Sequence, residues 1–229
     1  MPIDHDAAAI ATPALKLHEK PVVIRVLDVG CGAGDSLNEE LQLRCGGVED
    51  APQMEMVGVD IDEEALARGK INYPQFLFAR ARGEQLPFPD GSFDAVISRV
   101  AMPYMDIPVA LREMRRVLKV GGELRIKLHP LSFTLSELAV EVQSGSLRRR
   151  AQNLVYRMYV VANGLAVHFA GFNFCFPLAR HRCESFQTRS GIERALIAAG
   201  FEQTDVSCWM TRITWPHCGD CRASARRSH

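Results

Sequence analysis

The sequence predicts an α/β fold, in which a mostly parallel sheet carries helices on both faces and a helical insertion follows the fifth strand. The run VVIRVLDV at 22–29 is almost continuously apolar, which is typical of a strand buried on both faces. Short strand and helix patterns then alternate up to about residue 129, and such alternation gives parallel strands. The alternation stops there and resumes near residue 190.

The elements follow from apolar spacing and turn residues. Strands are expected at 22–29, 54–60, 76–81, 93–98 and 123–129. Helices are expected at 36–44, 61–72 and 108–122, the last ending at a Gly-Gly pair. A helix at 190–201 and strand-like segments at 202–208 and 210–215 complete the core. In such sheets ligands bind beyond the carboxyl ends of the strands.

Five parts of the chain are distinguished: a lead-in at 1–20, a core at 21–129, an insertion at 130–187, a completing helix and strands at 188–215, and a basic tail at 216–229. A second helix is expected at 134–143 in the insertion. The run at 154–176 is apolar but is interrupted by Arg157, Asn163 and His168, which favours a lid helix over a membrane span. Three arginines at 148–150 leave peripheral contact with a membrane surface open.

The charge balance and the cysteine content predict a globular protein of the cytoplasm. The 27 basic and 27 acidic residues cancel, although residues 1–144 carry a net charge of −7 and residues 145–229 a net charge of +7. Attraction between the halves explains this asymmetry more simply than an anionic partner. The seven cysteines are odd in number and follow no secretory signal, which predicts reduced thiols.

The stretch VLDVGCGAGDS at 26–36 places Gly30, Gly32 and Gly34 directly after the first strand and before a helix. Bare backbone there lets a ligand approach closely, with helix N–H groups pointing at it. The pattern is G-x-G-x-G, not the G-x-G-x-x-G of dinucleotide-binding proteins. Asp60 ends the second strand, where a carboxylate can accept hydrogen bonds from both hydroxyls of a ribose.

With these residues in place, the chain resembles class I S-adenosylmethionine-dependent methyltransferases, of the broad group related to ubiquinone-biosynthesis methyltransferases. The resemblance covers roughly 22–128 and rests on four motifs in order: VLDVGCGAG at 26–34, VDI at 59–61, LPFPDGSFD at 86–94 and LREMRRVLKVGG at 111–122. It implies a Rossmann-like sheet of seven strands, S-adenosyl-L-methionine as cofactor and S-adenosyl-L-homocysteine as product.

The resemblance also implies a cofactor site. Its loop backbone would wrap the methionine part, with Asp28 ordering the loop and Ser98 beside it, while Asp60 holds the ribose and Ile61 packs on adenine. The implied cofactor-binding residues are Asp28, Gly30, Cys31, Gly32, Gly34, Asp60, Ile61, Gly83, Glu84 and Ser98.

One departure lies at the adenine edge. Arg82 stands where the family has an acid that meets the adenine amine, and a guanidinium cannot accept a hydrogen bond. Three alternatives stay open: Glu84 replaces the acid, a backbone carbonyl replaces it, or adenine is held by apolar contacts and the Gly83 N–H.

Catalytic residues are less defined, because a base is needed only if the acceptor must lose a proton. Candidates are His129, Tyr104 and His168, although capping of a strand end explains His129 more simply and packing explains Tyr104 and His168 more simply. No metal is expected, since Cys218 and Cys221 with His217 nearby fall short of the four ligands of a structural zinc site.

The predicted function is methyl transfer to a small, apolar or aromatic metabolite, on oxygen, nitrogen or carbon. The alternatives are an RNA or protein methyltransferase that docks through the basic C-terminal half, and a cofactor-binding protein without catalysis. A nucleic-acid base is disfavoured as acceptor, because Pro103-Tyr104 is not the Asn/Asp-Pro-Pro-aromatic motif and the chain contains no Pro-Cys dipeptide. The acceptor and the oligomeric state stay open.

Overall fold

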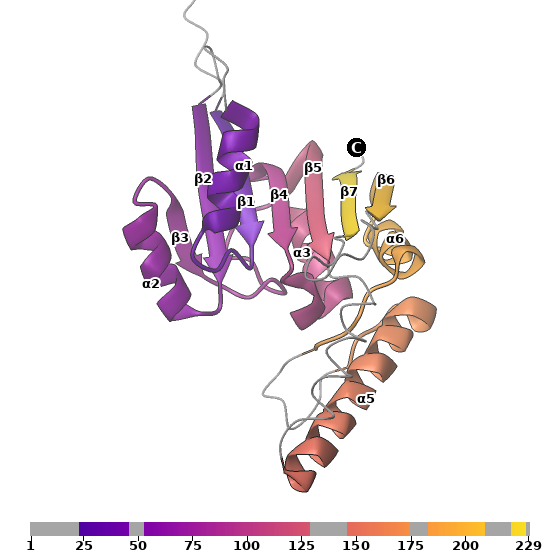
Figure 1. Cartoon of the computed structure of the whole chain (residues 1–229). Coiled ribbons are helices and arrows are strands. Elements are labelled where there is room, and N and C mark those ends of the chain that lie inside the picture. The colour runs from indigo at the N-terminus through magenta and orange to yellow at the C-terminus, as the bar shows by residue number, and fades with distance from the viewer. Residues whose placement is uncertain (1–22, 46–52, 129–145, 175–182, 209–220, 228–229) are drawn as a thin grey trace, which may run out of the picture.

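A single seven-stranded sheet, in the order β3-β2-β1-β4-β5-β7-β6, forms the centre of the molecule (Figure 1). The computed structural model describes residues 23–45, 53–128, 146–174, 183–208 and 221–227. The strands are β1 (Val23–Val29), β2 (Gln53–Asp60), β3 (Leu77–Arg80), β4 (Phe93–Arg99), β5 (Leu118–Leu128), β6 (Phe201–Cys208) and β7 (Cys221–Arg227). Strands β1 to β5 are parallel, and β7 runs antiparallel between β5 and β6.

Apolar side chains are buried on both faces of the sheet, which explains the continuous apolar strands. On one face, residues of β1, β2 and β4 pack with α1 (Asp35–Cys45) and α2 (Glu63–Asn72). On the other face, alternate residues of the same strands pack with α3 (Ile107–Val117) and α6 (Arg189–Ala198). The α/β Rossmann-like fold with a parallel sheet is therefore confirmed.

Two segments differ from the predicted elements. The helix predicted at 108–122 ends at Val117, and Leu118 already pairs with Phe93 of β4, because this leucine is fully buried against the sheet. Residues 221–227, expected in a basic tail, form β7 between β5 and β6. Strand pairing by the neighbours overrides the weak β-propensity of CRASARR. The predicted lead-in, the helix at 134–143 and the strand at 210–215 lie outside the described residues.

Helix α5 (Leu147–Ala170) projects from the edge of the sheet at which the parallel strands end, beside α6 (Figure 1). It begins seven residues before the expected 154, because the Ser146 side chain accepts a hydrogen bond from the Arg149 N–H and caps the helix. Gly171 ends it in a left-handed conformation. Among the described helices, α5 included, none has the length and apolar content needed to cross a bilayer.

Asn163 fixes α5 to the segments around it. Its side chain is fully buried, donates to the carbonyls of Cys183 and Glu184, and accepts from the Phe174 N–H at 2.9 Å. The segment 183–188, which leads into α6, is joined to the core through the Ser185 N–H, which donates to the Pro103 carbonyl at 2.9 Å. Helix α5 is thus held in a defined position relative to the loop after β4.

Cysteine pairing departs from the expectation of reduced thiols. Cys183 is disulfide-bonded, whereas Cys31 and Cys45 are free thiols. The expectation rested on the odd number of cysteines and on the lack of a secretory signal, and neither observation says which cysteines meet in space.

Arg116 of α3 explains the LPFPDG motif. Its guanidinium donates to the carbonyls of Leu86 and Phe88 and to the carboxylates of Asp90 and Glu113. Glu113 in turn accepts from the Leu86 N–H at 2.9 Å. One side chain thereby holds the turn before β4 against α3.

Candidate functional site

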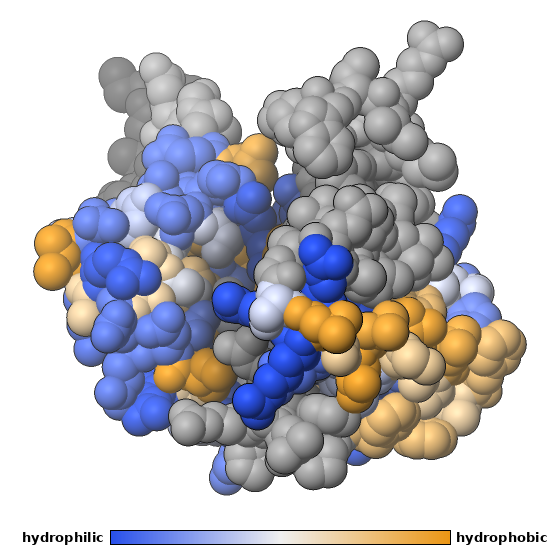
Figure 2. Space-filling model, turned by 60° about the horizontal axis from the view of Figure 1, so that its bottom comes forward, coloured by the Kyte–Doolittle hydropathy of each residue, from blue (hydrophilic) through white to orange (hydrophobic). Residues whose placement is uncertain are grey.

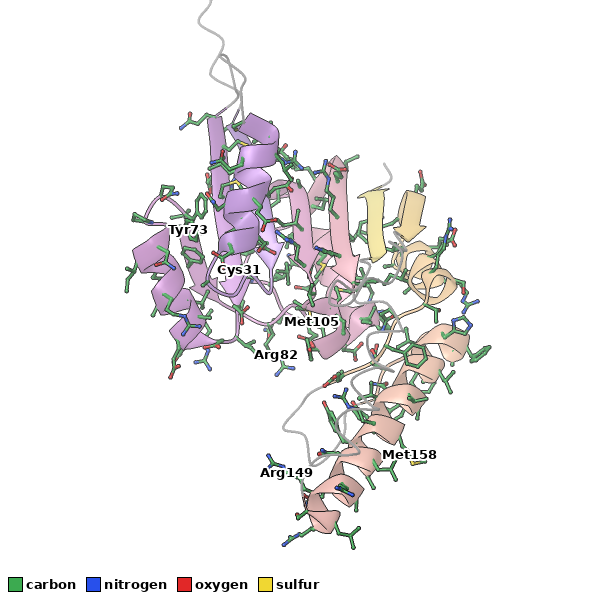
Figure 3. The ribbon with its side chains drawn as sticks, in the orientation of Figure 1. Cys31, Tyr73, Arg82, Met105, Arg149 and Met158 are labelled. Atoms are coloured by element: carbon green, nitrogen blue, oxygen red, sulfur yellow. The ribbon has the colours of Figure 1, made fainter. Side chains whose placement is uncertain are left out.

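The loop after β1 is fastened to the end of β2. The N–H groups of Gly30 and Cys31 both donate to the Val59 carbonyl, at 2.8 and 3.1 Å. The Gly32 N–H donates to Oδ2 of Asp60 at 2.8 Å. These bonds place the loop at the edge where the parallel strands end, as the position of Cys31 shows (Figure 3).

The three glycines of this loop have different roles, although all have positive φ, at 80°, 54° and 91°. A Cβ on Gly30 would lie 2.2 Å from the Ala101 Cβ, and one on Gly34 would lie 2.8 Å from the Phe78 ring. A Cβ on Gly32 would meet no atom within 4 Å. Gly30 and Gly34 therefore permit close packing, and Gly32 is the glycine whose backbone faces open space.

Asp60 lies beside this open position. Its Oδ2 accepts from Gly32 and its Oδ1 accepts from the Asp62 N–H at 2.9 Å. A carboxylate offers about four acceptor positions, so it can still accept from two hydroxyls. The next residue, Ile61, is 63% exposed and adds an apolar surface. Asp60 therefore offers acceptors that the hydroxyls of a ribose require, and Ile61 offers an apolar surface on which adenine can pack.

Asp28 lies beneath the loop and is fully buried. Its Oδ2 accepts from the Ser36 hydroxyl, but its Oδ1 has no hydrogen-bond partner. Burial raises the pKa of Asp28 to about 7, and the Ser36 hydrogen bond opposes that rise. A buried acceptor without a donor is costly, so this oxygen marks a place where a donor is missing. The open Gly32 backbone, the Asp60 carboxylate and this oxygen together fit a nucleoside cofactor that carries a hydrogen-bond donor.

Ser98 and Cys31 have inward-facing side chains. Ser98 is fully buried and its hydroxyl donates to the Val29 carbonyl at 2.8 Å. Cys31 packs against Gly58, where a Cβ would lie 2.6 Å from its Sγ, and burial raises the pKa of its thiol. Both side chains support the strands, which leaves only their backbone atoms for a ligand.

Glu84, one of the predicted partners of adenine, already contacts other groups of the chain. Arg82 is about half exposed and its Nε lies 3.5 Å from Oε2 of Glu84. Oε1 of Glu84 accepts from the Asp106 N–H at 3.0 Å, which anchors the start of α3. Arg82 points away from Cys31 and the loop (Figure 3).

Met105 is a residue of this region that the sequence analysis did not single out. A Cβ on Gly83 would lie 2.5 Å from its Sδ, and one on Gly30 would lie 3.5 Å from its Cε. The thioether therefore lies between the glycine loop and the segment around Gly83 (Figure 3). No motif marks it, and its only sequence signal is its place shortly after β4.

The turn that leads from β4 to Met105, beside the glycine loop, is strained. Val100 directly follows β4 and has a φ of 64°, which is costly for a β-branched residue. Its N–H donates to the Lys127 carbonyl of β5 at 2.8 Å. The turn presses Ala101 against Gly30 and leads into the short helix η1 (Met102–Tyr104).

The three candidate bases are placed differently. His129 lies outside the described residues. Tyr104 ends η1 and is 47% exposed, on the side of the sheet where the loop lies. His168 Nδ1 lies 2.6 Å from the Thr188 hydroxyl, which also accepts a hydrogen bond from the Gly191 N–H. His168 therefore joins α5 to α6.

No metal centre is found within the ranges that the structure describes, where no three His, Cys, Asp or Glu side chains are grouped to hold an ion. His217 and Cys218 of the tail lie outside those ranges.

Comparison with known proteins identifies the family. The profile of a methyltransferase domain matches residues 27–126. The demethylmenaquinone methyltransferase of Thermus thermophilus is 30% identical over 184 residues, which cover 77% of this chain and 74% of that protein. The malonyl-[acyl-carrier protein] O-methyltransferase of Erwinia pyrifoliae is 29% identical over 171 residues, covering 70% of this chain but only 60% of that enzyme.

Solved structures agree on the fold. A SAM-dependent methyltransferase from Methanosarcina mazei superposes with a TM-score of 0.55 at 18% identity, covering 90% of this chain and 93% of that one. The chain belongs to the S-adenosylmethionine-dependent methyltransferase family.

Replacing the glycines one at a time separates packing from ligand binding. Gly32→Ala should leave the protein folded and cost about 1–2 kcal/mol of stability from its positive φ, yet weaken S-adenosylhomocysteine binding, because the methyl group fills the open space. Gly34→Ala should lower stability by more, because its methyl group strikes the Phe78 ring. Urea unfolding and calorimetric titration measure the two effects. Wild-type affinity in Gly32→Ala would remove this position from the site.

The raised pKa of Asp28 predicts a pH dependence of stability. Unfolded Asp28 loses its proton near pH 4 and folded Asp28 near pH 7, so the folded state holds the extra proton in between. The free energy of unfolding should therefore fall from pH 4 to pH 7, by about 4 kcal/mol relative to Asp28→Asn, and stay level on either side. Urea titrations of both proteins across this range measure it. Parallel pH profiles would show that Asp28 titrates normally.

Proposed function

We propose that the protein binds S-adenosylmethionine at the glycine loop and transfers its methyl group to a small acceptor. The observation that carries the proposal is the open backbone at Gly32 beside the Asp60 carboxylate, above the unpartnered oxygen of Asp28. Membership of the methyltransferase family supports it.

Each part of the site has a role in holding the cofactor. Asp60 would accept the ribose hydroxyls, and the exposed Ile61 would pack on adenine. Since the carboxylate of Glu84 is engaged by Arg82 and by α3, the Gly83 N–H and apolar contacts are the favoured partners of adenine. The unpaired Oδ1 of Asp28 would receive a hydrogen bond from the methionine end or from a water that it orders.

The chemistry comes mainly from the cofactor, which supplies a methyl group activated by its sulfonium charge. The chain contributes position, because a bound acceptor needs only to be held in line with the methyl group. Met105 lies between the two sides of the site and would exclude water there. If the acceptor must lose a proton, Tyr104, which is exposed at the end of η1, is the candidate that we favour to receive it.

The acceptor we propose is a small apolar or aromatic molecule. The relative named for demethylmenaquinone supports this class of acceptor, whereas the relative named for malonyl-[acyl-carrier protein] is named for an acidic group on a carrier protein. In this chain, Met105 and Tyr104 give the part of the site beyond β4 an apolar and aromatic character.

Asp60→Ala tests the proposal. Loss of the charge-assisted hydrogen bonds to ribose should weaken S-adenosylhomocysteine binding by about 1–3 kcal/mol in calorimetric titration. The rate of S-adenosylhomocysteine formation from S-adenosylmethionine and a phenolic or quinol acceptor, at subsaturating cofactor, should fall in parallel.

Asp62→Ala is the matched control, because Asp62 caps α2 through the N–H groups of Glu64 and Ala65 and does not reach the loop. It should lower stability by about 1 kcal/mol and leave cofactor affinity unchanged. Equal affinities of the wild type and Asp60→Ala would contradict the assignment.

A further inference from the structure

Helix α5 is apolar on two opposite sides. Its inner side, with Tyr159, Val160 and Val167, is buried against the rest of the chain. Its outer side carries a row of exposed apolar side chains along the length of the helix. We call this row the outer stripe: Leu147 (84% exposed), Leu154 (46%), Val155 (56%), Met158 (64%), Leu165 (45%) and Phe169 (78%). Their spacing of three, four and seven residues places them on one side of the helix.

The outer stripe forms a continuous apolar surface (Figure 2). Met158, at its middle, points away from the sheet (Figure 3). The segment that follows the helix extends the surface with Phe172 and Phe174, which are 53% and 40% exposed. Part of the stripe is hollowed into a groove of ≈ 310 Å³. Its lining residues are Leu154, Arg157, Met158, Val161, Ala162 and Leu165.

The charges of α5 are all of one sign. The helix contains no Asp or Glu, and the exposed Arg148 and Arg149 lie in its first turn. Cations at this end of a helix face the positive end of its dipole, so the stability of the helix does not explain them. An anionic surface that meets the first turn does.

We propose that the outer stripe, Arg148 and Arg149 bind the surface of an anionic lipid bilayer, with α5 lying in the plane of the interface. A helix of 24 residues is about 36 Å long, and interfacial helices bury their apolar side by about 5–10 Å. The inner side stays attached to the protein through Asn163, so α5 lies in the interface without crossing the bilayer.

A second copy of this chain is the competing occupant. It would cover the apolar stripe, but its own α5 offers no acidic side chain to the arginines. A bilayer with acidic headgroups matches both features at once. The surface also lies at the end of the sheet where the candidate site is found (Figure 1).

Sedimentation with vesicles tests the proposal on the whole chain without cofactor, so its outcome does not depend on methyl transfer. The protein should sediment with vesicles of phosphatidylcholine mixed with phosphatidylglycerol, much less with pure phosphatidylcholine, and less as salt increases. Met158→Ser with Phe169→Ser should weaken the partition roughly tenfold or more, because less apolar area is buried. Arg148→Gln with Arg149→Gln should weaken it roughly 25-fold and remove the preference for phosphatidylglycerol.

Matched controls lie on other helices. Leu43→Ser on α1 replaces a side chain that is 78% exposed, and Arg112→Gln replaces an exposed arginine on α3. Neither should change vesicle binding, and circular dichroism should show every variant folded. Equal binding by stripe variants and controls would overturn the proposal, as would no binding to phosphatidylglycerol vesicles. A dimer that Met158→Ser dissociates, without vesicle binding by the wild type, would assign the stripe to self-association and also overturn it.

Discussion

The hydrogen bond from the Gly32 N–H to the Asp60 carboxylate is the constraint on which the site depends. It joins the loop after β1 to the end of β2, where the Val59 carbonyl already accepts from Gly30 and Cys31. Three positive-φ glycines cost conformational entropy, and these bonds offset part of that cost. In return, a bare stretch of backbone lies beside a carboxylate with acceptor capacity to spare. The chain's own hydrogen bonds define this arrangement, and a site preorganised in this way lowers the cost of ordering on binding.

The opposite side of the site is held by different means. Val100 adopts a strained left-handed conformation directly after β4, and the β5 backbone secures it through the Lys127 carbonyl. That turn places Ala101 against Gly30 and sends Met105 towards Gly83. Strain of this kind persists only where the surrounding structure over-determines it. One side of the site is thus held in place by hydrogen bonds, and the other side is held by packing.

The sequence predicted the parallel core well, since β1, β2 and β4 are apolar on both faces and α3 has a clear helical stripe. It could not separate the glycines, because only the neighbours Ala101 and Phe78 show which of them must lack a side chain. It missed β7, whose pairing comes from distant strands and not from its own residues. It likewise missed Met105, which no motif marks. These features depend on contacts between segments far apart in the chain, which local patterns do not record.

The central claim is that the loop after β1 is the cofactor cradle, and backbone amide resonances report on it directly. Titration of isotope-labelled protein with S-adenosylhomocysteine should shift the amides of Gly30, Gly32 and Gly34. The amides of Gly121 and Gly171, which lie elsewhere in the fold, should stay unchanged. Saturable binding that leaves the three loop amides in place and moves resonances elsewhere would contradict the account.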